Sequence, residues 1–169
     1  MGAGILPISS INGRLFFLFG KEAESHLWSD FGGGKENNES DFETAIREGS
    51  EELNGFLGSG EKLRKMVETN NILTIHYEKY KIFLFIIKYD RNLPIYFKNN
   101  YEFIKNSHLF KEVKKNDGLF EKEEIKWFCL KDMEKQSKNF RMFYRPILKI
   151  IMREHDTLLD KIVEYKNLN

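Results

Sequence analysis

The chain has 169 residues, and its 27 Lys and Arg against 26 Asp and Glu give a net charge of +1. This length fits one domain, and a content of 41% hydrophobic and 14% aromatic residues excludes a disordered chain. The near-neutral charge as a whole identifies no class of partner.

The cysteine count and the apolar runs bear on the compartment. Cys129 is the only cysteine, so no intrachain disulfide can form, which favours a reducing compartment. Residues 1–9 lack the features of a secretory signal, and the most apolar run, residues 82–87, is too short to span a bilayer. We therefore expect a cytoplasmic, intracellular protein with no membrane contact.

The chain begins with strand patterns. Residues 4–8 and 14–19 are apolar runs, and the Asn12-Gly13 pair between them is typical of a two-residue hairpin turn. Residues 26–31 predict a short strand that runs into a cluster of three glycines. The first part of the chain therefore predicts a hairpin and a third strand.

Helices and further strands follow. Residues 41–53 have the spacing of an amphipathic helix, and residues 62–68 predict a short second helix. A second hairpin is expected from two apolar runs, residues 72–77 and 81–89.

The last part of the chain predicts a helix, a strand and a long helix, at residues 101–115, 125–130 and 145–165. Pro146 suits the first turn of the long helix. The order of strands and helices predicts an α/β fold with a mixed sheet between helices on both faces.

The helix at residues 41–53 carries the clearest chemical pattern. Glu48, Glu51 and Glu52 fall within an arc of about 100° on one side of the helix, beside its apolar face. Carboxylates this close repel one another, and a hard divalent cation such as Mg²⁺ or Mn²⁺ would relieve that repulsion. Residues 33–55 contain seven acidic and two basic residues, which also favours a cation site, although a solvated acidic face is the alternative.

Two further features of this helix predict contacts. Arg47 flanks the acidic arc, and its guanidinium group can pair with Glu39 just before the helix. Gly49 and Ala45 on the core side would let the helix backbone approach the sheet closely, although Gly49 could also be a tolerated accident.

The segment from Gly33 to Gly55 resembles the Nudix box, whose pattern is G-x5-E-x7-R-E-U-x-E-E-x-G-U with U a bulky apolar residue. All charged positions of that pattern are present at the right spacing: Glu39, Arg47, Glu48, Glu51 and Glu52. The preceding Trp28 to Gly32 is similar to the strand and turn that enter the box. The residues from Gly2 to Gly58 also resemble Nudix proteins encoded by large DNA viruses.

This sequence departs from the pattern at three positions. Gly49 stands where the family has a bulky apolar residue, Asn54 where it has Gly, and Gly55 where it has an apolar residue. Asn tolerates left-handed backbone geometry, so we expect the Asn54-Gly55 pair to end the helix in place of the family's glycine.

The resemblance implies a single Nudix domain over residues 1–169, an α/β/α sandwich, and hydrolysis of a nucleoside diphosphate linked to another moiety. It implies that Glu48, Glu51 and Glu52, with the backbone carbonyl of Gly32, hold Mg²⁺ or Mn²⁺. Arg47 and Glu39 would form a structural pair that orients the helix, with Gly33 opening the box. For a general base outside the helix we consider three residues before the strand at 125–130: Glu121, Glu123 and Glu124.

The partner is expected to be a nucleotide-type small molecule, and its recognition is less well defined. Trp28, Phe31 and Tyr77 are candidates for stacking on a base. The basic stretch at residues 98–115 could contact RNA, although an ordinary amphipathic helix explains it equally well. An mRNA-decapping enzyme, a non-catalytic Nudix-fold binding module and a structural domain therefore remain alternatives, and the sequence predicts no oligomeric state.

Overall fold

The computed structural model describes residues 1–108, 110 and 119–168. Its strands are β1 (Gly2–Ile11), β2 (Arg14–Glu22), β3 (Trp28–Ser29), β4 (Phe31–Gly34), β5 (Asn71–Tyr77), β6 (Tyr80–Ile86) and β7 (Lys122–Phe128). Its helices are α1 (Asp41–Glu52), α2 (Gly60–Asn70), α3 (Leu93–Lys105), α5 (Leu130–Lys135), α6 (Tyr144–Arg153) and α7 (His155–Leu168), with a 3-10 helix η1 (Ser137–Asn139).

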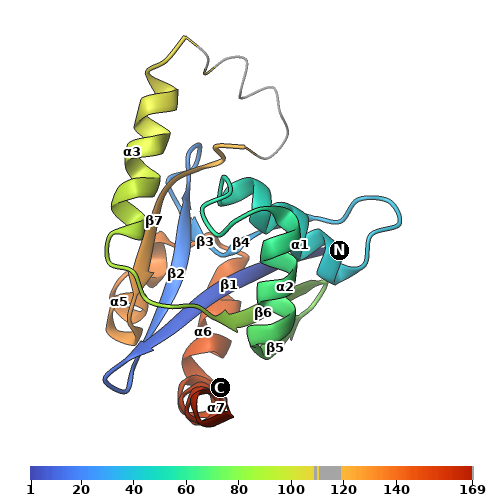
Figure 1. Ribbon diagram of the computed structural model, residues 1–169, viewed down its shortest axis with the longest axis vertical. Coiled ribbons are helices and arrows are strands. Elements are labelled where there is room, and N and C mark those ends of the chain that lie inside the picture. Colours follow the sequence, from blue (N-terminus) through green and yellow to red (C-terminus); the bar gives the residue numbers. More distant parts are fainter. Residues whose placement is uncertain (109, 111–118, 169) are drawn as a thin grey trace.

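Strand β1 lies at the centre of the sheet. It pairs in parallel with β6 and antiparallel with β2 and β4, and β5 extends the sheet beyond β6. On the other side, β2 also pairs antiparallel with β3 and β7. The described sheet thus has seven strands of mixed direction, with β1 and β2 crossing the middle of Figure 1.

The two faces of the sheet are covered by different helices. Side chains alternate along the strands, so that Ile5 joins one core and its neighbour Leu6 joins the other. Residues of α1, α2 and α3 fill the core with Ile5, whereas residues of α6 and α7 fill the core with Leu6. Figure 1 shows α1 and α2 in front of β1. The predicted α/β/α sandwich with a mixed sheet is therefore confirmed.

The strand predictions were accurate for both hairpins and only partly accurate for the strand between them. Asn12 and Gly13 have φ values of 49° and 71°, as a two-residue hairpin turn requires. The single strand predicted at residues 26–31 is instead two short strands, β3 and β4, which Asp30 separates, and His26 with a φ of 57° lies before them. Strand β7 also begins three residues earlier than predicted.

The helix predictions need three corrections. Helix α3 begins at Leu93, well before the predicted residue 101, and residues 109 and 111–115 of that prediction lie outside the described residues. The long helix predicted at 145–165 is two helices, because the chain turns at Glu154 and lets both α6 and α7 place apolar residues on the sheet. The short α5 and η1 were not predicted.

Gly49 marks the closest approach of α1 to the sheet. A side chain there would collide with Ile5 on β1, and Ala45 one turn earlier is fully buried. The predicted close approach of the helix backbone to the sheet is confirmed. It also explains why this chain lacks the bulky apolar residue that the Nudix pattern has at this position.

Among the described helices, none has both the length and the apolar character that crossing a membrane would require.

We expect Gly49→Ala to lower the free energy of unfolding by about 1–2 kcal/mol, because the overpacking against Ile5 exceeds the gain in helix propensity. Gly60→Ala at the start of α2 is the matched control. A methyl group there would meet only Ser50 Oγ at 3.7 Å, so stability should change by no more than about 0.5 kcal/mol. Denaturant unfolding measures both, and equal effects of the two substitutions would contradict the close approach.

Candidate functional site

Helix α1 begins with a capping box. Ser40 accepts a hydrogen bond from the Glu43 amide at 3.2 Å, and the Glu43 carboxylate accepts one from the Ser40 amide at 2.7 Å. These bonds satisfy backbone groups that the first turn leaves free. The local sequence therefore determines where α1 begins, and with it the side of the helix on which the acidic side chains lie.

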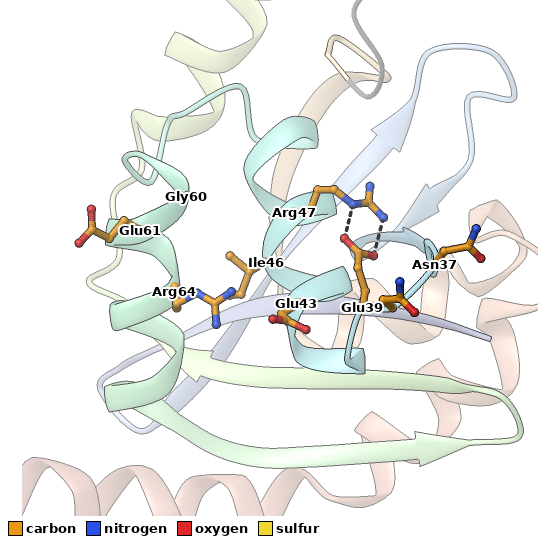
Figure 2. A pocket seen from close by; sticks show the side chains of 9 residues that line it. Asn37, Glu39, Glu43, Ile46, Arg47, Gly60, Glu61 and Arg64 are labelled. Atoms are coloured by element: carbon orange, nitrogen blue, oxygen red, sulfur yellow. Dashed lines mark hydrogen bonds and ion pairs between the residues drawn. The ribbon is translucent and has the colours of Figure 1, made fainter.

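Arg47 ties the middle of α1 to the loop before it. Its Nε donates to Glu39 Oε1 at 2.8 Å and its Nη2 donates to Glu39 Oε2 at 3.2 Å, as Figure 2 shows. Nη2 also donates to the Gly34 carbonyl at 2.9 Å. The Arg47 guanidinium group lowers the pKa of Glu39 to about 2. The structure thus brings Arg47 and Glu39 together, as the sequence suggested, in a bidentate pair.

The same guanidinium group also reaches two of the predicted metal ligands. Its Nη1 lies 3.0 Å from Glu48 Oε1 and 3.4 Å from Glu51 Oε2. Burial raises the pKa of both carboxyl groups, and Arg47 offsets only part of this effect. Glu48 and Glu51 therefore lie side by side, partly neutralised by Arg47.

Gly33 leaves room for the Glu48 side chain. A methyl group on Gly33 would lie 2.5 Å from Glu48 Oε1, so any larger residue would push this carboxylate away. The glycine that opens the predicted box is therefore needed for the close approach of the Glu48 side chain to β4.

Glu52 is the buried member of the acidic set, with 2% of its surface exposed. Its Oε2 accepts a hydrogen bond from the Gly32 amide at 2.8 Å, and its Oε1 lies 3.1 Å from Lys122 Nζ. Burial raises the pKa of Glu52 to about 8 despite the Lys122 ammonium group. Near neutral pH the Glu52 carboxylate therefore tends to bind a proton, or another cation in addition to the Lys122 ammonium group.

Lys122 is fully buried on β7 and connects three elements. Its ammonium group contacts Glu52 of α1 and Glu22 of β2, and donates to Ser29 Oγ of β3 at 3.0 Å. Glu22 also accepts a hydrogen bond from Arg141 Nη1 at 3.1 Å. A buried charge needs such partners, because an unpaired one costs several kcal/mol.

Three carboxylates converge beside Lys122. Oxygen atoms of Glu22, Glu52 and Glu121 lie within 4.8 Å of one another, and this is the only such group of three acidic, His or Cys side chains among the described residues. Glu121 also raises the pKa of Glu48 through its charge, after the larger effect of burial. Carboxylate oxygens are the ligands that Mg²⁺ and Mn²⁺ prefer, and Lys122 neutralises part of the negative charge of Glu22 and Glu52.

This cluster differs from the predicted ligand set. It contains Glu52 but brings in Glu22 and Glu121 in place of Glu48 and Glu51, which contact Arg47. Sequence reasoning missed Glu22 and Lys122. Lys122 is the first residue of β7 and lies three residues before the predicted strand, so nothing in the sequence indicated that it would be buried.

The three candidate bases have different surroundings. Glu121 joins the carboxylate cluster, whereas Glu123 pairs with Lys21 at 2.9 Å and with His26 at 2.8 Å. Glu124 lies 4.0 Å from Lys21. A register shift between β2 and β7 at this point turns successive side chains in different directions. Of the three, only Glu121 faces the cluster.

Solved structures with a similar fold come from several organisms. A C. elegans Ap4A hydrolase matches with 21% identity and a TM-score of 0.54 over 95% of this chain and 98% of that one. A Francisella tularensis bifunctional NMN adenylyltransferase/ADP ribose pyrophosphatase matches with 16% identity and a TM-score of 0.55, over 90% of this chain and 41% of that one. A Nudix hydrolase from M. Smegmatis, RenU, matches with 10% identity and a TM-score of 0.51 over 92% of this chain and 86% of that one.

The chain has the Nudix fold. No protein-family model and no curated protein matches the sequence. The acidic helix of the 23-residue box from Gly33 to Gly55 therefore lies in the fold that the resemblance implied.

The end of α1 shows how this Nudix fold accommodates a departure from the box pattern. Asn54 and Gly55 have φ values of 49° and 74°, so both lie in the left-handed region. The expectation that this pair ends the helix is confirmed. Asn54 Oδ1 also accepts a hydrogen bond from the Phe120 amide at 3.1 Å, which the sequence did not indicate.

The candidate stacking residues do not gather at the carboxylates. Phe31 is fully buried and Trp28 is 6% exposed, packed edge-on against Phe128 at 4.9 Å, so the expectation that they stack on a base is wrong. Tyr77 is half-buried against the α6 side of the sheet, where it lines a hollow of about 620 Å³. With 14% aromatic residues, most rings are needed in the two cores.

A second hollow, of about 520 Å³, lies between α1 and α2 (Figure 2). Glu39 and Arg47 line it together with Arg64 of α2, but none of the clustered carboxylates does. This hollow therefore does not mark the acidic site.

The pair of Arg47 and Glu39 predicts a pH-dependent contribution to stability. The pKa of Glu39 falls from 4.5 to about 2 on folding, so its ionised form stabilises the fold above pH 4.5, and this contribution is lost as the pH falls toward 2. Glu39→Gln should lower the free energy of unfolding by about 1 kcal/mol at pH 7 and by less at pH 3.

Glu36→Gln is the control for this measurement, because Glu36 is 68% exposed and lies 3.9 Å from Arg47 Nε. It should leave the free energy of unfolding unchanged at both pH values. Equal destabilisation by Glu39→Gln at pH 7 and pH 3 would contradict an ionic role for the pair.

Proposed function

We propose that this chain, as a single Nudix domain over residues 1–169, is a divalent-metal-dependent pyrophosphohydrolase. Its substrate would be a nucleoside diphosphate linked to another moiety. The observation that carries the proposal is the convergence of Glu22, Glu52 and Glu121 beside a segment, residues 33–55, that retains every charged position of the Nudix box.

Glu52 is the central ligand of the proposed metal site, because it is common to the box pattern and to the cluster. Glu121 and Glu22 lie within reach of the same ion, and Glu48 lies beside Glu121. The box pattern adds Glu51 and the Gly32 carbonyl as further ligands. When bound, Mg²⁺ or Mn²⁺ neutralises the diphosphate and lowers the pKa of a coordinated water.

The remaining groups orient the reaction and move its proton. Arg47 and Glu39 fix the helix that carries the ligands, and Lys122 limits the repulsion between Glu22 and Glu52. Glu121 is the exposed carboxylate of the cluster and the candidate base. It takes a proton from the attacking water as a new P–O bond forms and the bridging P–O bond breaks, with the electron pair leaving on the released phosphate.

The similar structures suggest which substrates to test first. One similar protein is an Ap4A hydrolase and another is an ADP ribose pyrophosphatase, so dinucleoside polyphosphates and nucleotide sugars are the first substrates to test. For RNA, Lys98 and Lys105 of the basic stretch lie on α3 within the described part, and Lys105 lies over the Tyr101 ring at 5.5 Å. Capped RNA therefore belongs in the panel as an alternative substrate. A non-catalytic binding module is disfavoured because Glu48, Glu51 and Glu52 are all present.

The test is turnover of Ap4A, ADP-ribose and capped RNA with Mg²⁺ or Mn²⁺, comparing the parent chain with Glu52→Gln. We expect the rate to fall at least about a hundredfold, or about 2.7 kcal/mol of barrier. Mn²⁺ binding, followed by electron paramagnetic resonance, should weaken in parallel. Glu121→Gln provides a second variant at an exposed position, in case loss of the partner of Lys122 prevents folding.

Glu68→Gln on α2 is the matched control, because Glu68 is 55% exposed and is not one of the clustered carboxylates. It should keep the parent rate and Mn²⁺ affinity. Absence of turnover of all three substrates by a folded parent chain, or full activity of both Glu52→Gln and Glu121→Gln, would contradict the proposed function.

A further inference from the structure

Asn54 joins the end of the acidic helix to the segment that carries Glu121. It follows the α1 C-cap Leu53, and its side-chain oxygen accepts a hydrogen bond from the Phe120 amide, 66 residues further along the chain. The Nudix box pattern has glycine at this position, and glycine would end the helix equally well but could not accept this bond. The hydrogen bond between the Asn54 side chain and the Phe120 amide is thus not needed to end the helix.

The bond acts on the residue directly before Glu121. Phe120 has a φ of 60°, a left-handed conformation that needs support from its surroundings. On the other side, the Glu121 carbonyl accepts a hydrogen bond from the Ala23 amide at 2.8 Å, just past the end of β2. The backbone at Glu121 is therefore tied to α1 through Asn54 and to the end of β2 through Ala23.

These two ties reach the same elements that carry the other two clustered carboxylates. Glu52 lies two residues before Asn54, and Glu22 lies one residue before Ala23. Glu121 is exposed, so without backbone ties the entropy of its segment would oppose convergence with Glu52 and Glu22.

We propose that Asn54 is a positioning residue that holds Glu121 against Glu52 and Glu22. The inference deepens and rests on the proposed function, since the Glu121 carboxylate is there the base and a ligand candidate. Asn54 touches neither metal nor substrate in this role. It acts by fixing the distance between α1 and the segment before β7, and therefore the geometry of the carboxylate cluster.

The Asn54 amide nitrogen decides what an aspartate can restore. Nδ2 is buried and has no hydrogen-bond partner within the described part of the chain. Aspartate keeps the acceptor for the Phe120 amide but puts a charged oxygen in the place of Nδ2. Asn54→Asp should therefore restore only part of what Asn54→Gly loses.

A double-mutant cycle separates this role from simple helix capping. Asn54→Gly keeps the left-handed φ available and removes the side chain that accepts the hydrogen bond, and it is combined with Glu121→Gln. We expect Asn54→Gly to weaken Mn²⁺ binding and lower kcat by about tenfold each, with little change in KM. In the Glu121→Gln background, the same substitution should change neither quantity further.

Asn12→Gly is the matched control, because Asn12 has the same φ of 49° and lies in the exposed turn between β1 and β2. It should leave Mn²⁺ affinity and kcat unchanged. Parent-like Mn²⁺ affinity in Asn54→Gly, or an equal loss with and without Glu121, would overturn the inference.

The two proposals can fail separately. If no substrate is turned over but the Mn²⁺ cycle shows the expected coupling between Asn54 and Glu121, the proposed hydrolysis is wrong and the positioning role stands. If the parent chain turns over substrate but Asn54→Gly and Glu121→Gln reduce kcat independently, the positioning role is wrong and the hydrolase proposal stands. A parent chain that binds no Mn²⁺ would overturn both.

Discussion

The acidic site depends on one buried ammonium group. Lys122 contacts carboxylates from α1 and β2, and no part of its surface is exposed. Removing this charge would leave Glu22 and Glu52 to repel each other in a largely water-free setting, where charge interactions are strong. The lysine therefore allows acidic side chains from separate elements to stay close together.

The position of α1 is the second constraint, and it is achieved by small residues and a single arginine. Gly49 lets the helix backbone reach Ile5 on β1, and Gly33 leaves room for the Glu48 carboxylate. Arg47 then ties the helix to Glu39 and the Gly34 carbonyl. These contacts hold α1 against β1 and β4, and Glu52 on its acidic face contacts Gly32 of β4 and Lys122 of β7.

The sequence predicted the parts of the structure that are local. The helix at 41–53, the turn at Asn12-Gly13 and the contact between Arg47 and Glu39 all follow from spacing within about ten residues, where helical geometry and turn chemistry decide the outcome. The Nudix fold followed from the box pattern.

The parts that sequence reasoning missed depend on distant pairing. Glu22 and Lys122 meet only because β2 and β7 pair across 100 residues with a register shift, which no local pattern reveals. The aromatic candidates Trp28 and Phe31 proved to be core residues for the same reason, since their burial is decided by neighbours that are remote in sequence.

The most direct test of the central claim, that these carboxylates bind a divalent ion, is anomalous diffraction from crystals grown with Mn²⁺. A manganese peak bound by Glu52 and Glu121 is expected, whereas a well-ordered cluster with no peak at saturating Mn²⁺ would contradict the account.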